Sequence, residues 1–310
     1  MTRLLITGGA GFIGANLAGH ARAAGVDVTV LDDLSASHSG SLDGLEVNLV
    51  VGSVLDAGML DIALRGVDSV VHLAAVADVP SSIRAPLASH AANATGTLMV
   101  LEACRRNEVG HLVAASSSAV YGANSASPAH ERQWVRPLSP YGVSKLATEA
   151  YVLAYQSSFD LATMAFRFFN VYGPGQSASH VYAAVIPAFV DALLGGRTLT
   201  VHGDGRQTRD FVFVGSVCQV LLRAAQTRMT HPEPVNLAFG TETSLLDLVS
   251  QLEAATGLAA PLRHGDPQVG DIAHSRADPS MLRSLFPEVT PVGLGDGLDA
   301  TIAWFRARAC

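Results

Sequence analysis

Short runs of apolar residues alternate with helix-length segments through the first half of the chain. Runs that are apolar throughout are typical of strands buried on both faces, and their alternation with helices predicts a parallel sheet covered by helices. The expected strands are Leu4–Thr7, Val28–Leu31, Val47–Val51, Ser69–Leu73, His111–Ala115 and Thr163–Phe168, and the expected helices include Phe12–Ala24, Ala91–Arg106 and Pro140–Ser157. The pattern therefore predicts an α/β fold built on a doubly wound parallel sheet.

The second half of the chain is less regular. After about Val171, glycine-rich turn signals interrupt the alternation of strands and helices. The turn signals are Gly173-Pro174-Gly175, Gly195-Gly196 and Gly203-Asp204-Gly205, and the expected helices are Tyr182–Leu194, Val217–Ala225 and Ser244–Ala255. We expect residues 1–172 to form the main domain, with later segments returning to its sheet, and residues 173–310 to form mainly a smaller mixed α/β lobe.

Composition and charge exclude several classes of protein. The 310 residues are 49% hydrophobic, which excludes a disordered chain, and the net charge of −7 argues against nucleic acids or anionic membranes as partners. Cys104, Cys218 and Cys310 lie far apart without metal-ligand spacing, so neither a disulfide framework nor a metal site is expected. The apolar run after Arg3 is too short for a signal peptide, and no run of about 18 apolar residues predicts a membrane span. We therefore expect a cytoplasmic protein.

A glycine-rich loop follows the first expected strand. The segment Gly8-Gly-Ala-Gly11-Phe-Ile-Gly14 joins that strand to a helix, where glycines let the backbone approach a pyrophosphate and the helix N-terminus offers free N–H groups. Asp32 ends the second strand, where a carboxylate accepts both ribose hydroxyls of NAD and repels the 2′-phosphate of NADP. The loop predicts a Rossmann-type site for NAD. The alternative is a structural turn beside a surface acid.

One lysine stands among the 20 basic residues, and it is Lys145. On a helix it lies one turn after Tyr141, so the two side chains share a face. We expect the ammonium to favour the phenolate and lower the pKa of Tyr141, and its donors suit ribose hydroxyls better than a planar guanidinium does. About twenty residues earlier, the fifth strand ends in Ser116-Ser117-Ser118. This constellation predicts a tyrosine that acts as a base, and the alternative is an ordinary amphipathic helix with a surface lysine.

Ordered motifs along nearly the whole chain resemble the extended short-chain dehydrogenase/reductase family, in its branch of nucleotide-sugar epimerases and dehydratases. Besides the glycine loop and Tyr141–Lys145, the matching motifs are Leu31-Asp-Asp-Leu-Ser35, Val71-His-Leu-Ala-Ala75, Asn93-Ala-Thr-Gly-Thr97, Ser116–Gly122, Arg167–Pro174 and Gly203–Phe211. So many motifs in the family's order are far more specific than any one of them. The resemblance implies an enzyme that holds NAD and acts on a nucleotide sugar bound mainly by the second lobe.

The resemblance also implies a role for each matching residue. Tyr141 would take the proton from the sugar 4-hydroxyl, Ser117 would hydrogen-bond the same oxygen, and Lys145 would hold the nicotinamide ribose. The implied NAD contacts are Gly8, Gly11, Phe12, Ile13, Asp32, Asp33, Leu34, Ser35, Ser53, Val54, Leu73, Ala74, Ala75, Asn93, Ser116, Tyr141, Lys145 and Phe168. The implied substrate contacts are Ser117, Ser118, Tyr141, Asn170, Val185, Leu199, Val201, Arg209, Asp271 and Ser275, with Arg209 on the diphosphate.

The residues after Ser117 indicate which reaction of this branch the chain would catalyse. Family dehydratases carry an Asp-Glu pair there, whereas Ser118-Ala119 can neither remove a C5 proton nor protonate a leaving group. The resemblance therefore implies NAD-dependent 4-epimerisation of a UDP-sugar through a transient 4-keto intermediate. In the family, a small residue at the position of Ser275 goes with a roomy sugar pocket, so the resemblance leaves the sugar open among a hexose, an N-acetylhexosamine and a hexuronate.

Two alternatives to epimerisation stay open. One is a nucleotide-sugar 4-reductase, dehydrogenase or dehydratase of the same fold, and the other is a non-catalytic NAD-binding protein. For the assembly, the resemblance implies a homodimer through the helices near 91–106 and 140–157.

Overall fold

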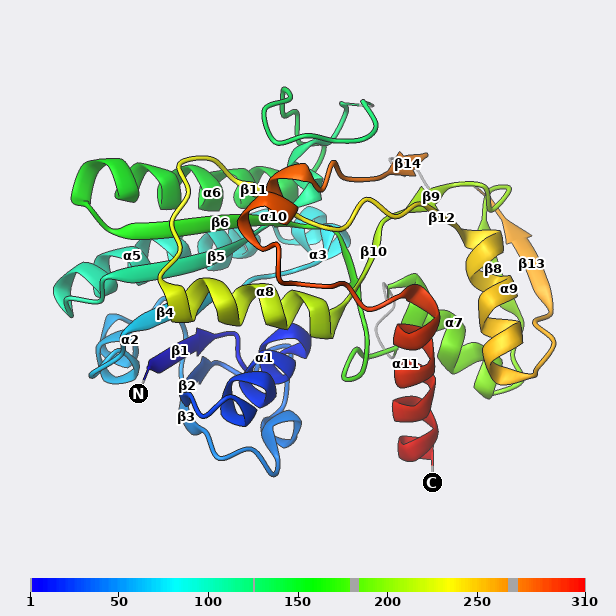
Figure 1. Cartoon of the computed structure of the whole chain (residues 1–310), viewed down its shortest axis with the longest axis horizontal. Coiled ribbons are helices and arrows are strands. Elements are labelled where there is room, and N and C mark those ends of the chain that lie inside the picture. Colours follow the sequence, from blue (N-terminus) through cyan, green and yellow to red (C-terminus); the bar gives the residue numbers. More distant parts are fainter. Residues whose placement is uncertain (1, 125, 179–183, 267–272, 310) are drawn as a thin grey trace. The chain divides into compact units, whose positions relative to one another are not determined.

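A computed structural model describes residues 2–124, 126–178, 184–266 and 273–309. The chain divides into two compact units (Figure 1). The first comprises Met1–Asn124, Glu131–Phe168 and Cys218–Asn236, and the second comprises Ser125–His130, Phe169–Val217 and Leu237–Cys310. Each unit therefore combines segments that are distant in the sequence.

Among the described residues, seven strands form the central sheet in the order β11-β6-β5-β4-β1-β2-β3, and the neighbours from β6 to β3 pair in parallel. The strands are β1 (Arg3–Thr7), β2 (Asp27–Asp32), β3 (Asn48–Val51), β4 (Ser69–His72), β5 (His111–Ser117), β6 (Ala162–Phe168) and β11 (Val235–Leu237). Every residue of β4 and β5 is buried, as expected of strands covered on both faces. The predicted doubly wound parallel sheet is confirmed.

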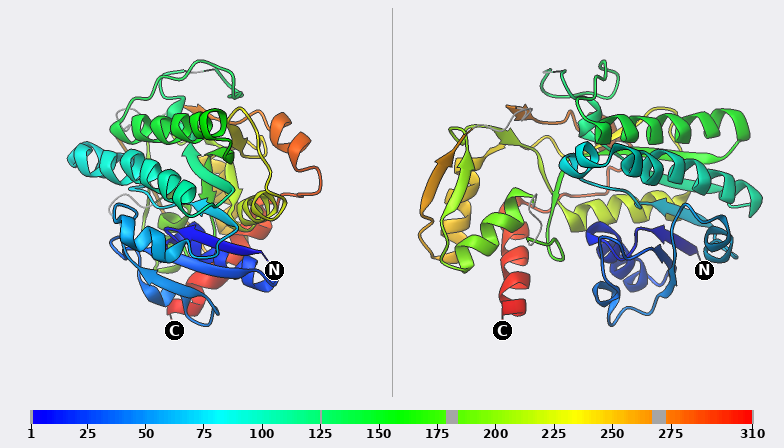
Figure 2. Two further views of the ribbon diagram at one scale, coloured as in Figure 1. Left: turned by 90° about the vertical axis from the view of Figure 1, so that its left-hand side faces the viewer. Right: turned by 180° about the vertical axis from the view of Figure 1, so that it is seen from behind.

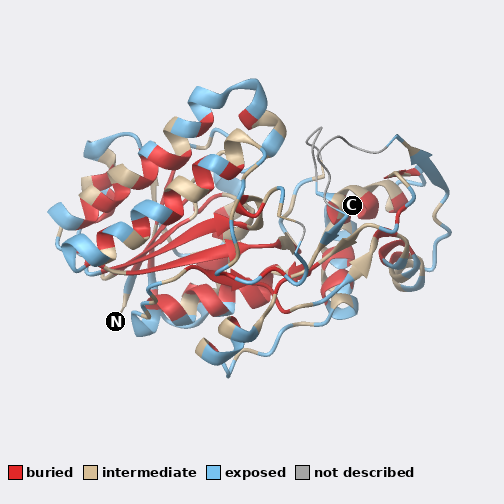
Figure 3. Ribbon diagram, turned by 90° about the horizontal axis from the view of Figure 1, so that it is seen from above, coloured by how far each residue is buried: buried red, intermediate tan, exposed pale blue. Residues whose placement is uncertain are grey.

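Helices cover both faces of this sheet, and Figure 3 shows its strands buried between the helical layers. On one face, α2 (Ala57–Ala63), α5 (Gly96–Arg106) and α6 (Pro140–Phe159) pack around an apolar core that includes Leu60, Leu101 and Val152. There α5 and α6 lie side by side (Figure 2). On the other face, α1 (Phe12–Ala23) packs against β1 and β2, and α8 (Val214–Thr227) lies on the same side (Figure 1).

The order of the strands reverses between β1 and β4. In sheets of this kind, ligands bind outside the carboxyl ends of the strands at such a reversal. The segments that leave this edge are the glycine loop, the turn after β4, and the short elements α3 (Val79–Arg84) and α4 (Pro86–His90). The fold therefore places the glycine loop and the other predicted site motifs of the first unit along one edge of the sheet.

The start of α6 is defined by local sequence. Ser139 Oγ accepts a hydrogen bond from Gly142 N at 3.1 Å, and Pro140 occupies the first helical position. The predicted helix from Pro140 is present and extends to Phe159. This start places Tyr141 in the first turn of the helix, next to the carboxyl edge of the sheet.

The second unit is a mixed α/β assembly of small sheets and helices. Its strands pair as β10-β7, β12-β9-β14 and β13-β8, and only the β12-β9 pair is antiparallel among the described pairs of this unit. The elements are β7 (Asn170–Tyr172), α7 (Val185–Leu194), β8 (Leu199–His202), β9 (Thr208–Arg209), β10 (Phe211–Phe213), β12 (Thr243–Ser244), α9 (Leu245–Thr256), β13 (Leu262–Gly265), β14 (His274–Ser275), α10 (Ser280–Leu285) and α11 (Leu294–Ala309). Tyr172, Phe189 and Leu248 are among the buried residues of its core.

Two of the predicted helices differ from the helices in the structure. The segment expected as one helix, Ala91–Arg106, begins as a π-helical turn at Ala91–Thr95 before α5. The expected helix Tyr182–Leu194 is α7, which begins at Val185, and residues 179–183 lie outside the described part of the chain. None of the helices in the described ranges has the length and hydropathy needed to cross a membrane.

Candidate active site

The glycine loop closes tightly against the turn after β4. Gly8 has a φ of +68°, and a Cβ atom there would lie 2.7 Å from Ala74 N. A Cβ atom at Gly14 would lie 2.3 Å from Gly8 O, so a larger residue at either position requires the backbone to shift. Gly11 is the N-cap of α1 and has no side chain that could occupy the first N–H groups of the helix. The loop therefore fits the pyrophosphate of a dinucleotide.

Asp32 ends β2 beside this loop and is 8% exposed. Its Oδ2 accepts a hydrogen bond from Ala10 N at 2.9 Å, and its Oδ1 accepts one from Leu34 N at 2.9 Å. In the same turn, Asp33 Oδ1 accepts a hydrogen bond from Ser35 N at 3.0 Å. The carboxylate of Asp32 thus ties the glycine loop to the turn after β2, where a ribose-binding acid is expected.

The turn after β4 is held by an amide side chain. Leu73 N donates to Thr7 O at 3.0 Å, which continues the pairing of β4 with β1. Asn93 is 1% exposed, and its Oδ1 accepts from Val76 N at 2.7 Å while its Nδ2 donates to Val76 O at 3.0 Å. The same Nδ2 donates to Ser144 Oγ on α6 at 2.8 Å. Asn93 therefore fixes the turn that carries Leu73–Ala75 against α6.

The other predicted cofactor contacts also follow the carboxyl ends of strands. Phe12 and Ile13 begin α1, Ser53 and Val54 follow β3, and Ser116 and Phe168 lie at the ends of β5 and β6. Because the carboxyl ends of parallel strands meet at one edge, these residues border the same edge of the sheet as the glycine loop.

Ser117, Tyr141 and Lys145 meet where β5 ends against α6. The hydroxyl of Ser117, the last residue of β5, hydrogen-bonds that of Tyr141. Tyr141 N donates to Ser82 Oγ at 3.0 Å, which fixes the first turn of α6. Lys145 is 5% exposed, and its Nζ donates to Ala115 O at 2.9 Å. The structure thus brings together the three side chains that the sequence predicts to be catalytic.

Burial dominates the ionisation of these groups. It raises the pKa of Tyr141, the hydrogen bond from Ser117 opposes that rise, and the carboxylate of Asp78 adds to it. In this structure the effect of burial is the largest, so the net shift of the Tyr141 pKa is upward. Burial lowers the pKa of Lys145 to about 8, so the amine is mainly protonated at neutral pH. Burial and the charge of Lys145 lower the pKa of His72 on β4 to about 3, so His72 is neutral.

Most predicted substrate contacts belong to the second unit. Asn170 begins β7, Val185 begins α7, Arg209 ends β9 and Ser275 ends β14. Arg209 and Ser275 are partners in the parallel pairing of β9 with β14, so the structure brings these two together. Leu199 and Val201 on β8 are 1% and 0% exposed, and both belong to the apolar core of the unit. Ser118, in contrast, begins the 3₁₀ turn Ser118–Val120 after β5 in the first unit, and Asp271 lies outside the described residues.

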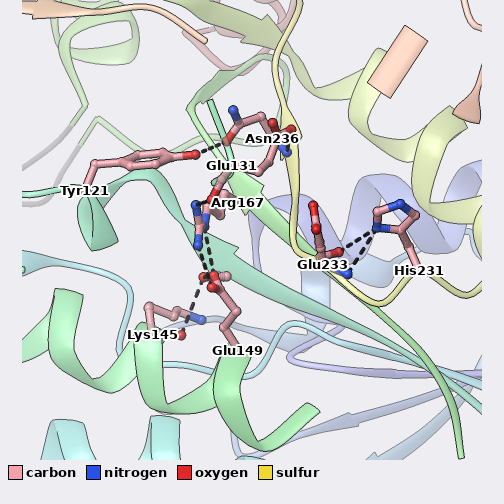
Figure 4. Close-up of polar contacts among 9 residues, drawn as sticks. Tyr121, Glu131, Lys145, Glu149, Arg167, His231, Glu233 and Asn236 are labelled. Atoms are coloured by element: carbon pink, nitrogen blue, oxygen red, sulfur yellow. Dashed lines mark hydrogen bonds and ion pairs between the residues drawn. The ribbon is translucent and has the colours of Figure 1, made fainter. Parts of the chain in front are cut away.

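A buried ion pair that was not predicted from the sequence lies beside the predicted catalytic residues. Arg167 on β6 and Glu149 on α6 are 3% and 4% exposed, and Figure 4 shows their side chains meeting near Lys145. The signal was present, because Arg167 interrupts an apolar run that predicts a buried strand. A charge on such a strand requires a partner of opposite charge, and Glu149 lies one helical turn after Lys145.

Comparison with known proteins covers nearly the whole chain. The model of the NAD dependent epimerase/dehydratase family matches residues 4–238. A UDP-glucose 4-epimerase of Mycolicibacterium smegmatis is 34% identical over 99% of this chain and 99% of its own length.

Solved structures agree with this match. A UDP-N-acetylglucosamine 4-epimerase from Methanobrevibacter ruminantium M1, solved in complex with UDP-N-acetylmuramic acid, has a TM-score of 0.93 and 32% identity, with 99% of each chain covered. The UDP-glucose 4-epimerase of Thermus thermophilus, solved with NAD, has a TM-score of 0.88 and 32% identity, covering 98% of this chain and 99% of that one. The similarity therefore extends across both units of the chain.

Proposed function

Because the chain belongs to the NAD dependent epimerase/dehydratase family, we propose that it catalyses the NAD-dependent 4-epimerisation of a UDP-sugar through a transient 4-keto intermediate. The observation that carries this proposal is the meeting of Ser117, Tyr141 and Lys145 at the end of β5. These residues share one sheet edge with a glycine loop whose backbone packs too closely for larger side chains and which leads into the N-terminus of α1, where no side chain caps the helix. Two relatives that match over 99% of their own length are a UDP-glucose 4-epimerase and a UDP-N-acetylglucosamine 4-epimerase.

The glycine loop and the turns after β2 and β4 are proposed to hold NAD. The N–H groups at the start of α1 would face the pyrophosphate, Asp32 would accept a ribose hydroxyl, and Leu73–Ala75 would border the nicotinamide half. NAD held there would supply the acceptor for the hydride from C4 of the sugar and, once reduced, the donor that restores it on the opposite face.

Proton transfer at the sugar 4-hydroxyl is the task of Tyr141. Since burial raises its pKa, the phenolate needs the positive charge of Lys145 one turn away and the hydrogen bond from Ser117. Tyr141 takes the hydroxyl proton as the 4-keto sugar forms and gives it back when the 4-hydroxyl is restored. Ser117 donates to the same sugar oxygen and holds it beside the phenol.

Epimerisation needs no further acid or base, and that separates it from dehydration. Loss of water would require a group that removes the C5 proton and another that protonates the leaving hydroxyl. The two residues after Ser117 are Ser118 and Ala119, and neither carries a carboxylate.

The substrate end of the site is proposed to lie on the second unit. Arg209 would bind the diphosphate with charge-assisted hydrogen bonds, and its neighbour Ser275 would leave space at C2 of the sugar. We propose that the substrate is a UDP-hexose, a UDP-N-acetylhexosamine or a UDP-hexuronate, with Asn170 near the diphosphate.

The test is turnover without added cofactor. Purified protein is incubated with UDP-glucose, UDP-N-acetylglucosamine and UDP-glucuronate in turn, and products are resolved by chromatography and mass spectrometry. A 4-epimer of unchanged mass is expected, and Tyr141→Phe should abolish its formation while leaving the fold intact. Stoichiometric NADH, or a product lighter by one water, would show a different reaction of the same fold. Binding of NAD without turnover of any UDP-sugar would indicate a non-catalytic protein.

A homodimer through the helices near 91–106 and 140–157 is the proposed assembly, with α3 and α4 beside the second of these helices. Helices α3, α4 and α6 pack together and carry exposed apolar side chains, including Ile83 at 62%, Leu87 at 86% and Val143 at 53% exposure. Such residues are typical of a surface covered by a partner. Sedimentation should give twice the mass of the chain, and Leu87→Asp should shift the equilibrium toward monomer.

The cytoplasm is the proposed compartment. Among the described residues, Cys104 and Cys218 are buried free thiols, as in proteins that function in a reducing environment.

A further inference from the structure

A single buried carboxylate links α6 to two neighbouring strands. Arg167 on β6 binds Glu149 through two hydrogen bonds, Nε to Oε2 at 2.9 Å and Nη2 to Oε1 at 2.6 Å. Ser116 Oγ on β5 donates to the same Oε2 at 2.9 Å (Figure 4). The side chains of the ion pair are 4% and 6% exposed. Glu149 therefore receives directed donors from both β5 and β6.

The guanidinium is fixed on its other side as well. Arg167 Nη1 donates to Glu131 O at 3.0 Å, and the guanidinium carbon lies 4.8 Å from the centre of the Tyr121 ring. Tyr121 donates its hydroxyl to Asn236 Oδ1 at 2.6 Å, and Asn236 N donates to Glu131 Oε1 at 2.9 Å. Burial raises the pKa of Tyr121 to about 12, so the phenol keeps the proton that this bond requires. The orientation of Arg167 is thus set by several independent contacts.

The last three residues of β5 each contact α6 at positions one turn apart. Ser117 bonds to Tyr141, Ala115 O accepts from Lys145 Nζ, and Ser116 donates to Glu149. Tyr141, Lys145 and Glu149 are spaced four residues apart, so they follow one face of the helix. The contact at Glu149 therefore continues the row of contacts made by the two catalytic side chains.

We propose that the Glu149–Arg167 ion pair, acting through Ser116, is a positioning device that sets the register of α6 against the end of β5 and so holds Tyr141 and Lys145 against Ser117. The inference rests on the proposed function, because the geometry it fixes is that of the proton-transfer site. Glu149 and Arg167 touch neither substrate nor cofactor in this account, and they act through the helix and the strand.

Directed bonds suit this task better than apolar packing. A buried ion pair adds little net stability compared with apolar residues of the same volume, but its hydrogen bonds have one preferred geometry. An apolar contact at position 149 would allow α6 to slide or rotate slightly, and a displacement of about 1 Å at a reacting group lowers a rate by about 100-fold.

The mildest test removes the Ser116 hydroxyl, which joins β5 to α6 by donating to Glu149 Oε2 at 2.9 Å and to Lys145 O at 3.5 Å. Ser116→Ala keeps the ion pair and deletes its bond to the strand, Ser116→Thr retains the hydroxyl, and Glu149→Gln removes the charge. Tyr155→Phe is the matched control, since Tyr155 lies on the same helix and its hydroxyl bonds Glu102 on α5 at 2.5 Å, away from the site. For each variant, kcat and KM for the UDP-sugar are measured per folded molecule, alongside Tm.

Positioning predicts a specific pattern among these variants. We expect Ser116→Ala to lower kcat about tenfold and Glu149→Gln about 100-fold, with KM little changed, and Ser116→Thr to restore most of the loss. Tyr155→Phe should lower Tm without lowering kcat. If Ser116→Ala and Glu149→Gln affect kcat no more than Tyr155→Phe does, the pair has only a structural role and the proposal is wrong.

A second readout does not depend on turnover. Because Lys145 is the only lysine, labelling lysine with ¹³C at the ε carbon gives one side-chain NMR signal. Among the described residues, the titratable and charged groups near it include Glu149 on α6 and Arg167 on β6 (Figure 4), His72 on β4, and Tyr141 one helical turn before it. Glu149→Gln leaves the charge of Arg167 uncompensated and should lower the pKa of Lys145 below its parental value of about 8, whereas Tyr155→Phe should leave it unchanged.

The two readouts separate the two proposals. If the parent turns over no UDP-sugar but Ser116→Ala and Glu149→Gln change the Lys145 signal, the proposed function fails and the positioning role stands. If the parent is active and these variants lower kcat no more than Tyr155→Phe does, the positioning role fails alone, whatever the Lys145 signal shows.

Discussion

Replacing Lys145 with methionine should make the protein more stable at neutral pH while it abolishes activity. The side chain is 5% exposed and protonated at pH 7, so the folded protein buries an ammonium group that water would solvate better. Methionine has a similar length and no charge. The substitution therefore removes the free-energy cost of burying an ammonium group, which the folded protein accepts because catalysis needs the lysine.

The magnitude follows from the pKa of the lysine. A fall from 10.5 to about 8 corresponds to about 3 kcal/mol at about 1.4 kcal/mol per unit. Loss of the hydrogen bond to Ala115 O, 2.9 Å from Nζ, offsets about 1–2 kcal/mol of this gain because the carbonyl remains buried. A net stabilisation of about 1–2 kcal/mol is expected at pH 7.

The stability difference between the parent and Lys145→Met should change with pH in a definite direction. Below about pH 8 both the folded and the unfolded parent carry the proton, so the full cost is present. Between about pH 8 and 10.5 the folded state releases the proton before the unfolded state does, and the cost disappears. The advantage of Lys145→Met should therefore be constant near pH 6–7 and shrink steadily above pH 8.

Urea unfolding of the parent and the variant at pH 7, 8, 9 and 10 measures this difference directly, because other titrating groups are common to both proteins. A stability difference that does not change over this pH range would refute the argument that burial lowers the pKa of Lys145.

Three further predictions follow from the same structure. Lys145→Arg should lower turnover by about 100-fold or more while circular dichroism stays unchanged, because a planar guanidinium cannot take the place of a compact ammonium at a site that is 5% exposed. Gly14→Ala would bring a Cβ atom within 2.3 Å of Gly8 O, so calorimetry should show NAD binding weakened by about tenfold or more. Ser244→Ala removes the bond from Asp247 N to Ser244 Oγ, 3.0 Å long, that caps α9, and it should cost about 1 kcal/mol in urea unfolding with turnover unchanged.

The sheet and the glycine loop could be predicted because their signals are local. Strands such as β4 and β5 are apolar runs bounded by turns, and the loop after β1 carries glycines where the backbone comes close to itself. The four-residue spacing of Tyr141 and Lys145 needs only the assumption of a helix. These features depend on neighbours in the sequence.

The features that were missed depend on distant residues. The strand β11 is three residues long and lies next to β6 only in the folded chain, so no periodicity reveals it. The π-helical turn Ala91–Thr95 reads as ordinary helix, although it carries the Asn93 amide that holds the turn after β4. The net direction of the Tyr141 pKa shift could not be predicted, because burial is a property of the fold and the spacing shows only the neighbouring charge.

The central claim is that one carbon of the sugar loses a hydride and receives the same hydride back. A UDP-sugar that carries deuterium at C4 tests this directly, with the product read by NMR and mass spectrometry in ordinary water. We predict that the 4-epimer keeps its deuterium at C4 and that Tyr141→Phe forms no epimer. Loss of the deuterium to solvent, or its accumulation in NADH with a 4-keto sugar released, would contradict it.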